Sequence, residues 1–266
     1  MHDDLIHLGL IDDADVVLDE AALALALPDH PRASREAFQG VFQAIADRLE
    51  AAGSEGLDAR SQAELLAIVI GDEFGFVGDS ATYDDPANTD MIRVIERRRG
   101  LPVSLSILYV AAARRLGWTA NILDVPGHVL VLVGEEAVPV MIDPFRGGEP
   151  VDRDQLVALV HAMDPGRIAA TNHIATMPNR AILLRLLMNA ATRAEAAGDG
   201  RRALILYHRM TLVAPDSGHA WWERARLELT GGDIGAARGS LSAMLEITRE
   251  PELRAKVSGI LASLHA

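Results

Sequence analysis

Cysteine is missing from all 266 residues of the sequence. Its absence excludes disulfides, thiolate metal sites and a cysteine nucleophile. Long apolar runs are missing as well, since no stretch approaches the roughly 20 residues that a membrane span needs. The N-terminal segment MHDDLIHLGL is acidic and lacks the pattern of a signal peptide. We therefore expect a soluble, cytoplasmic protein without a membrane partner.

Lysine is scarce, because every basic residue except Lys256 is arginine. Positive charge of any kind is scarce in the first third of the chain: residues 1–95 carry a net charge of −15, whereas residues 96–266 carry +2. Such an acidic region repels a phosphate backbone, so we expect no nucleic-acid partner. HExxH, CxxC and P-loop patterns are also absent, and we expect neither a metal nor another cofactor.

Apolar residues, in contrast, make up 49% of the chain, which is enough for a sizeable core. In the first third of the chain their spacing predicts helices. An alanine- and leucine-rich run covers 21–27, and Ser34 is the expected N-cap of a helix over 35–53. Ser61 and Glu64 form a capping-box pattern, which predicts the start of another helix.

The middle of the chain combines a helix with strands. Pro102 suits the first turn of a helix that runs to Leu116 and ends at Gly117. This helix is apolar nearly all round, so we expect it to be buried. Three β-rich runs follow it, at 119–125, 128–133 and 138–142. A buried helix followed by an antiparallel sheet predicts a helix-rich α+β fold.

The C-terminal part of the chain repeats itself at a spacing of 34 residues. The matched pairs are Ala191 and Ala225, Gly198 and Gly232, Asp199 and Asp233, Ala203 and Ala237, and Met210 and Met244. This period resembles the tetratricopeptide (TPR) unit, a pair of helices that pack through small residues. Two units are visible, with a closing helix at 253–264. TPR units present a concave surface to peptides, so the resemblance implies a protein or peptide partner here.

Residues with catalytic chemistry gather between positions 97 and 148. The buried helix is followed by a strand that begins with His128 and by another that ends near Asp143. This order resembles that of papain-like and transglutaminase-like thiol enzymes. Those enzymes place a nucleophile at the helix N-terminus and bring His and Asp to it on neighbouring strands. Since 15 residues separate His128 from Asp143, a hairpin can place the two side by side.

Several short motifs make the resemblance more specific. They are Phe74-Gly75-Phe76, Asp85-Pro86-Ala87-Asn88, the ERRRGLP run that ends at Pro102, Pro126-Gly127-His128, Asp143-Pro144-Phe145 with Gly147-Gly148, and Leu186-Leu187-Met188-Asn189. Together they resemble the SirB1 family of bacterial proteins, which pairs a transglutaminase-like domain with TPR-like helices. The resemblance implies three regions: an acidic helical layer at 1–92, a transglutaminase-like core at 93–165 and TPR-like helices at 178–266.

The position of the nucleophile departs from this resemblance. A transglutaminase-like helix carries its cysteine fifteen residues before the closing glycine, and the same count from Gly117 arrives at Pro102. Proline has neither a nucleophile nor an N–H group. Ser104 is about 200° further round the helix, and Ser106 is about 400° round and one turn deeper. The resemblance thus implies a degenerate dyad of His128 and Asp143, with the two serines as the remaining nucleophile candidates.

Three functions follow from these residues. The missing cysteine and the TPR-like region favour a catalytically silent protein that acts as an interaction or scaffolding module. The surviving His/Asp pair instead supports a hydrolase or transferase with a Ser-His-Asp arrangement. The third alternative is binding of an anion or small ligand in the vacated cleft by His128 and Arg99. Structural roles compete with each of these: His128 bonded to Asp143, Ser104 bonded to a carbonyl group, and internal ion pairs for the run Arg97–Arg99.

Overall fold

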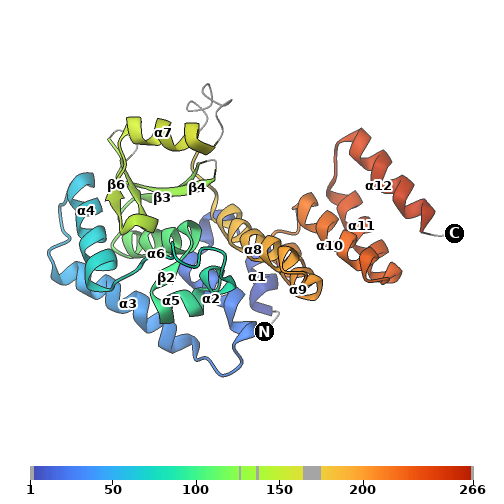
Figure 1. The fold of residues 1–266 in the computed structure, drawn as a ribbon, viewed down its shortest axis with the longest axis horizontal. Coiled ribbons are helices and arrows are strands. Elements are labelled where there is room, and N and C mark those ends of the chain that lie inside the picture. Colours follow the sequence, from blue (N-terminus) through green and yellow to red (C-terminus); the bar gives the residue numbers. More distant parts are fainter. Residues whose placement is uncertain (1–2, 126, 136–137, 164–174, 265–266) are drawn as a thin grey trace. The chain divides into compact units, whose positions relative to one another are not determined.

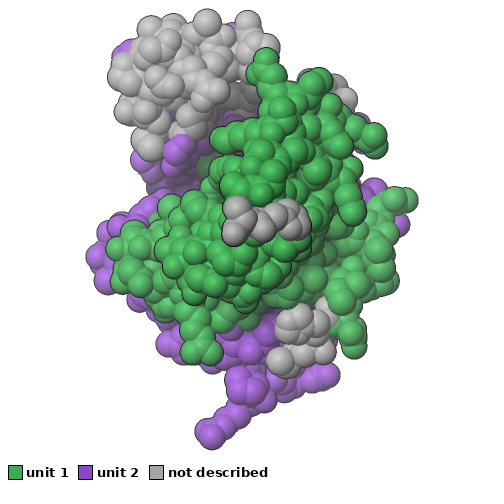
Figure 2. Space-filling model, turned by 90° about the vertical axis from the view of Figure 1, so that its right-hand side faces the viewer, with its two compact units in different colours: residues 1–12, 183–266 green, residues 13–182 purple. Residues whose placement is uncertain are grey.

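The protein is described here by a computed structural model of residues 3–125, 127–135, 138–163 and 175–264. It forms two compact units (Figure 2): residues 1–12 and 183–266 make up unit 1, and residues 13–182 make up unit 2. This division groups the first helix with the C-terminal helices, and the three consecutive regions implied by the resemblance stay a prediction. None of the helices in the described ranges has both the length and the apolar character needed to cross a membrane.

Unit 2 contains a small sheet surrounded by helices, which confirms the helix-rich α+β fold (Figure 1). Its helical segments are η1 (Asp13–Asp15), α2 (Leu18–Ala26), η2 (Leu27–Asp29), α3 (Arg35–Ala51), α4 (Ala59–Leu66), the π-helix η3 (Ala67–Glu73), η4 (Pro86–Thr89), α5 (Met91–Arg97), α6 (Pro102–Arg115), η5 (Pro144–Arg146) and α7 (Arg153–Met163). Its strands are β1 (Val77–Gly78), β2 (Arg99–Gly100), β3 (Ala120–Val125), β4 (His128–Val133), β5 (Val140–Asp143) and β6 (Glu149–Pro150).

Helix α6 is the central helix of unit 2. It begins at Pro102, and Gly117 follows its end with a positive φ of +73°, both as predicted. Every residue from Pro102 to Ala113 is buried. Helices α2 and α3 pack against α6, and so do strands β3 and β4. The apolar character of this helix on all sides therefore reflects neighbours on all sides.

The four-stranded antiparallel sheet, in the order β3-β4-β5-β6, lies between α6 and α7 (Figure 1). On one face, Leu123 and Leu130 form an apolar cluster with Leu156 of α7. Side chains alternate along a strand, so the paired residues Ile122 and Val131 point to the opposite face, toward α6. The three predicted strands correspond to β3, β4 and β5, with ends that agree within two residues.

The N-termini of α3 and α4, two early helices of unit 2, are capped by side chains. Ser34 accepts a hydrogen bond from the N–H of Ala37 and caps α3, as predicted. The predicted capping box at Ser61 is wrong, because α4 starts earlier. Asp58 accepts a hydrogen bond from the N–H of Ser61 at 2.8 Å and is the N-cap. An aspartate caps as well as a serine does, and Ser61 lies within the first turn.

Unit 1 is built from helices alone in the part that the structure describes. They are α1 (Asp3–Leu10), α8 (Asn179–Ala196), α9 (Gly200–Val213), α10 (Gly218–Thr230), α11 (Ile234–Ile247) and α12 (Pro251–Ser263), and the boundary with unit 2 falls within α8. Helix α1 packs against α9, where a Cβ at Gly9 would overlap the carbonyl oxygen of Leu212. Glycine is therefore required for the close approach of these two helices.

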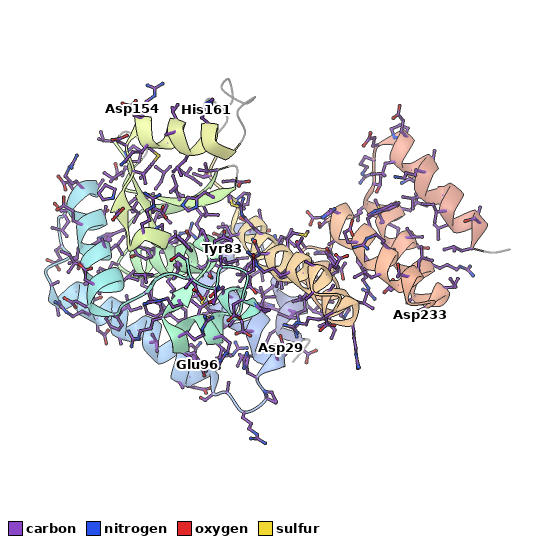
Figure 3. The ribbon with its side chains drawn as sticks, in the orientation of Figure 1. Asp29, Tyr83, Glu96, Asp154, His161 and Asp233 are labelled. Atoms are coloured by element: carbon purple, nitrogen blue, oxygen red, sulfur yellow. The ribbon has the colours of Figure 1, made fainter. Side chains whose placement is uncertain are left out.

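The 34-residue repeat of the sequence is also a repeat of structure in unit 1. Gly198 and Gly232 both have positive φ angles, +77° and +80°, at the turns before α9 and α11. Asp199 and Asp233 each cap the next helix by accepting a backbone hydrogen bond at 2.9 Å, and Asp233 lies at the turn between α10 and α11 (Figure 3). The alanines four positions further on are both fully buried. Equivalent residues thus make equivalent turns, while the TPR assignment stays a prediction.

Candidate functional site

The two predicted dyad residues meet at one end of two neighbouring strands. Strand β4 begins with His128 and strand β5 ends with Asp143. Nε2 of His128 lies 2.9 Å from Oδ2 of Asp143, which is a hydrogen-bond distance. The two side chains are only 16% and 2% exposed. The antiparallel pairing of β4 with β5 brings them together, whereas Pro126 of the same motif lies outside the described residues.

Asp143 also organises the turn that follows it. Its Oδ1 accepts a hydrogen bond from the N–H of Phe145 at 3.0 Å, so Asp143 caps η5. Nε of Arg146, whose side chain is exposed, lies 3.7 Å from Oδ2. The ring of Phe145 stands edge-on to His128, with centroids 6.4 Å apart, and to Tyr83, which is labelled in Figure 3. Asp143 is thus both the partner of His128 and a turn residue.

Within the described part of the chain, no group of three or more His, Asp or Glu side chains is placed to hold one metal ion. Among the described residues, His128 and Asp143 are therefore an imidazole–carboxylate pair and not part of a cluster of metal ligands. The chemistry open to such a pair is hydrogen bonding or proton transfer. Proton transfer in catalysis requires a reacting group beside the imidazole ring.

Ser104 does not provide that group, because the backbone uses its hydroxyl. Oγ of Ser104 lies 2.9 Å from the carbonyl oxygen of Asn88 and 3.0 Å from that of Leu101, and donates to them. The side chain is fully buried. Gly100 makes room for it, since a Cβ at that position would lie 2.6 Å from Oγ. Ser104 therefore joins the start of α6 to η4.

Ser106 is equally buried, but its hydroxyl has a different environment. Its Oγ has no hydrogen-bond partner among the described residues, so it is not bonded to His128. Pro102, at the position implied for the nucleophile, is the first residue of α6 and is buried as well. Neither serine of α6 is hydrogen-bonded to the imidazole ring in the described structure.

Alanine substitutions at the two serines should differ in their effect on the free energy of unfolding. Ser104→Ala should lower the free energy of unfolding by about 1 kcal/mol, because it removes a hydrogen bond to buried carbonyl groups. Ser106→Ala should leave it unchanged or raise it by about 1 kcal/mol, since burying a hydroxyl without a partner is itself unfavourable. The two sites share one buried helix and control for each other. Urea unfolding measures both, and equal losses would contradict the assigned environments.

Arg97 is held by the acidic loop that precedes it. Its guanidinium group pairs with Asp79 at 2.7 Å and donates to the Asn88 side chain at 3.1 Å. Asp79 also accepts hydrogen bonds from the side chain and the backbone of Thr82, and these two bonds are the main reason that the pKa of Asp79 falls to about 2. The ion pair between Arg97 and Asp79 therefore connects the ERRRGLP motif to the loop before it.

The next two arginines hold the Phe74-Gly75-Phe76 motif. Arg98 has a left-handed backbone conformation with a φ of +55°, and its guanidinium group lies 5.8 Å and 5.5 Å from the ring centres of Phe74 and Phe76. It also donates to the carbonyl group of Phe74. Arg99, the predicted anion ligand, donates to the carbonyl group of Gly75 at 3.2 Å. Two motifs of the resemblance thus contact each other through these arginines.

Tyr109 is a buried polar residue of this region that the sequence did not single out. Its hydroxyl has no hydrogen-bond partner among the described residues. Burial raises the pKa of Tyr109, and the negative charges of Asp72 and Asp143 raise it further. A Cβ at Gly148, whose φ is +87°, would lie 3.0 Å from the Tyr109 ring. In the sequence, only the glycine pair of the Asp143 motif indicated that a large side chain packs close to the backbone there. The apolar pattern of α6 does not distinguish a buried tyrosine from its apolar neighbours.

Comparison with known proteins identifies relatives that match different lengths of this chain. A family model described as the transglutaminase-like superfamily matches residues 36–188. A UPF0162 protein of Xylella fastidiosa (strain 9a5c) is 27% identical over 244 residues, which cover 90% of this chain and 87% of the relative. A UPF0162 protein of Vibrio cholerae is 30% identical over 185 residues, or 67% of each chain. F-box only protein 21 of Homo sapiens is 32% identical over 82 residues, which cover 31% of this chain and 13% of that protein.

The segment matched by the family model contains α6, the four-stranded sheet and the His128–Asp143 pair. These elements follow one another in the order that the resemblance implied, and the match spans more than half of the chain. The chain therefore belongs to the transglutaminase-like superfamily.

Proposed function

We propose that this chain is a catalytically silent member of the SirB1 family that binds a protein partner through TPR-like helices in unit 1. The observation that carries the proposal is the chemistry at the start of α6. Pro102 occupies the position implied for the nucleophile and has no reactive group. Ser104 donates to carbonyl groups, and Ser106 has no partner among the described residues. His128 thus lacks a nucleophile from the helix on which the resemblance implies one.

In this proposal the His128–Asp143 pair has a structural role. The Asp143 carboxylate accepts hydrogen bonds from a side chain on β4 and from the backbone of η5. A buried carboxylate with two such bonds stabilises the turn that it caps. On this account the fold depends on the pair.

Support for a binding role comes from the helices of unit 1. A hollow of about 430 Å³ lies among residues of α8, α9 and α10, and another of about 350 Å³ lies among residues of α10, α11 and α12. His219 lines both. Stacked helix pairs bind peptides along such surfaces, because each pair adds a further stretch of groove.

A serine-directed fluorophosphonate probe tests the catalytic part of the proposal. We expect no labelling of the native chain, because no serine hydroxyl of α6 is hydrogen-bonded to His128 in the described structure. Labelling that disappears in Ser104→Ala or Ser106→Ala, and also in His128→Ala, would overturn the proposal. That result would establish the alternative Ser-His-Asp hydrolase or transferase.

Selection from a random-peptide display library on the immobilised full chain tests the binding part. We expect selected peptides to lose binding to His219→Trp, which places a bulky ring on a residue that lines both hollows. Val138→Trp is the matched control, because Val138 is an exposed residue of unit 2. A selection that yields no binders, or binders indifferent to His219→Trp, would contradict a partner site in unit 1.

A further inference from the structure

We propose that Gly78 and Phe145 are positioning residues for the imidazole of His128, and that Arg98 supports them by fixing the backbone of β1. The ring of Phe145 is the link, since it lies against Gly78 and stands edge-on to His128 with centroids 6.4 Å apart. The imidazole needs an orientation both in a silent chain and in the hydrolase or transferase alternative. The proposal therefore goes beyond the proposed function and does not depend on it.

Phe145 is held by contacts of its backbone and of its ring. Its N–H donates to Oδ1 of Asp143 at 3.0 Å, and Oδ2 of the same carboxylate lies 2.9 Å from Nε2 of His128. Its ring packs on Gly78, where a Cβ would overlap the ring carbons. Edge-on aromatic pairs at the separation of His128 and Phe145 attract each other. The carboxylate and the ring thus favour the same orientation of the imidazole.

Gly78 is needed for the room that it leaves, and its backbone conformation is an ordinary one. It does not have a positive φ angle, in contrast to Gly147 and Gly148. An alanine can therefore adopt the backbone conformation of Gly78 without strain. Strand β1 packs against η5, which contains Phe145, and the missing side chain at Gly78 is what admits the ring.

Strand β1 is itself fixed by the ERRRGLP run. The N–H of Val77 donates to the carbonyl group of Arg98 at 3.3 Å, and the N–H of Asp79 donates to a carbonyl group of β2 at 3.2 Å. These two hydrogen bonds lie on either side of Gly78. The guanidinium group of Arg98 also lies over both rings of Phe74-Gly75-Phe76, the motif that precedes β1. Arg98 thus holds β1 through its backbone and through its side chain.

The hydrogen on Nε2 of His128 reports the orientation of the imidazole. A carboxylate only accepts hydrogen bonds, so Nε2 of His128 must donate to Asp143. In the neutral ring this bond fixes the tautomer with hydrogen on Nε2. An imidazole that turns away from Asp143 exposes this hydrogen to solvent, so the hydrogen exchanges faster.

NMR spectroscopy of the ¹⁵N-labelled full chain with Gly78→Ala tests the proposal. The Nε2–H signal of His128 is identified by its loss in His128→Gln. We expect Gly78→Ala to displace the Phe145 ring and to accelerate the exchange of this hydrogen roughly tenfold or more. Gly40→Ala is the control, because a Cβ there meets nothing within 4 Å, and it should leave the exchange unchanged. Native exchange in Gly78→Ala would overturn the role of Gly78.

Phe145→Leu tests the ring without adding an atom at Gly78, and it keeps the N–H that Asp143 binds. We expect the same acceleration of the Nε2 hydrogen, while the backbone amides of β4 exchange as in the native chain. Native exchange of the Nε2 hydrogen would overturn the positioning role of Phe145, even if Gly78→Ala fails to fold. Equal acceleration of the β4 amides would overturn it as well, because it would show a general loss of stability.

Arg98→Ala tests the support of β1. We expect it to accelerate the Nε2 exchange of His128 in the same direction but less than Phe145→Leu does, because Arg98 acts through the strand. Arg93→Ala is the matched control, since Arg93 is an exposed arginine that pairs with Glu96 on the same helix, α5. Equal exchange in Arg98→Ala and Arg93→Ala would overturn the role of Arg98.

Discussion

Gly71→Ala should destabilise unit 2 by about 3 kcal/mol, because the added methyl group would overlap a neighbouring backbone segment. Gly71 is buried in the π-helix η3, and a Cβ there would lie 2.5 Å from the carbonyl oxygen of Gly147. That neighbour is backbone, so it cannot move aside as a flexible side chain would. Gly147 and Gly148 also have positive φ angles of +71° and +87°, which restrict how their segment can shift.

A shift of Gly147 and Gly148 would also move Asp143 in the candidate site. The N–H of Gly148 donates to the carbonyl group of Asp143 at 2.8 Å, so the segment that Gly71 contacts continues into the residue that holds His128. We therefore expect Gly71→Ala to disturb the imidazole as well as the stability. The imidazole signal of His128 in an NMR spectrum reports the first effect, and urea unfolding reports the second.

Gly40→Ala is the matched control for this prediction. Gly40 lies in the middle of α3, and a Cβ there would meet nothing within 4 Å. Because alanine favours a helix interior over glycine, we expect Gly40→Ala to raise the free energy of unfolding by about 0.5–1 kcal/mol. Equal effects of the two substitutions would show that the contact between η3 and Gly147 is not tight.

Asp143→Ala should lower the free energy of unfolding by about 3 kcal/mol. The substitution removes the acceptor of two hydrogen bonds, from the His128 ring and from the N–H of Phe145, and it leaves both donors in a largely buried region. Asp154→Ala is the control, because this carboxylate is exposed on α7 (Figure 3), and it should change stability by less than about 0.5 kcal/mol.

A double-mutant cycle separates the contribution of the His128–Asp143 hydrogen bond to stability from the contribution of the η5 cap. We expect a coupling energy of about 1–2 kcal/mol between His128→Ala and Asp143→Ala, because each substitution removes the same hydrogen bond. The rest of the Asp143 effect belongs to the cap of η5. If the coupling is absent, the pair does not stabilise the fold, and the structural role assigned to it is wrong.

The fold was predictable from the sequence wherever a local pattern decided it. The extent of α6, from Pro102 to the turn at Gly117, follows from proline and glycine chemistry together with an unbroken apolar run. The start of α4 was predicted wrongly, because Asp58 and Ser61 are both acceptable caps and lie three residues apart. The spacing of apolar residues in α4 fits a helix that starts at either cap. Only the backbone of the folded chain shows which of the two caps is used.

Within the candidate site, the sequence identified the His128–Asp143 pair but not what surrounds it. The pair follows from residue order and strand spacing, both of which are properties of one hairpin. The environments of Ser104 and Ser106 depend instead on η4 and on the other segments around α6. Tyr109 was hidden for the same reason, since its surroundings come from η3 and the turn after β5.

By itself the sequence determined that these 266 residues contain no cysteine, that a buried helix precedes an antiparallel sheet, and that the C-terminal part repeats every 34 residues. These features depend on residue type and on neighbours close along the chain. The tertiary structure alone decided that α1 packs against α9 and that His219 lines two hollows among the helices of unit 1. It also decided that one serine hydroxyl of α6 has carbonyl partners while the other has none among the described residues. The reason is physical: burial, hydrogen-bond partners and local charge are set by segments that lie far apart in sequence and come together when the chain folds.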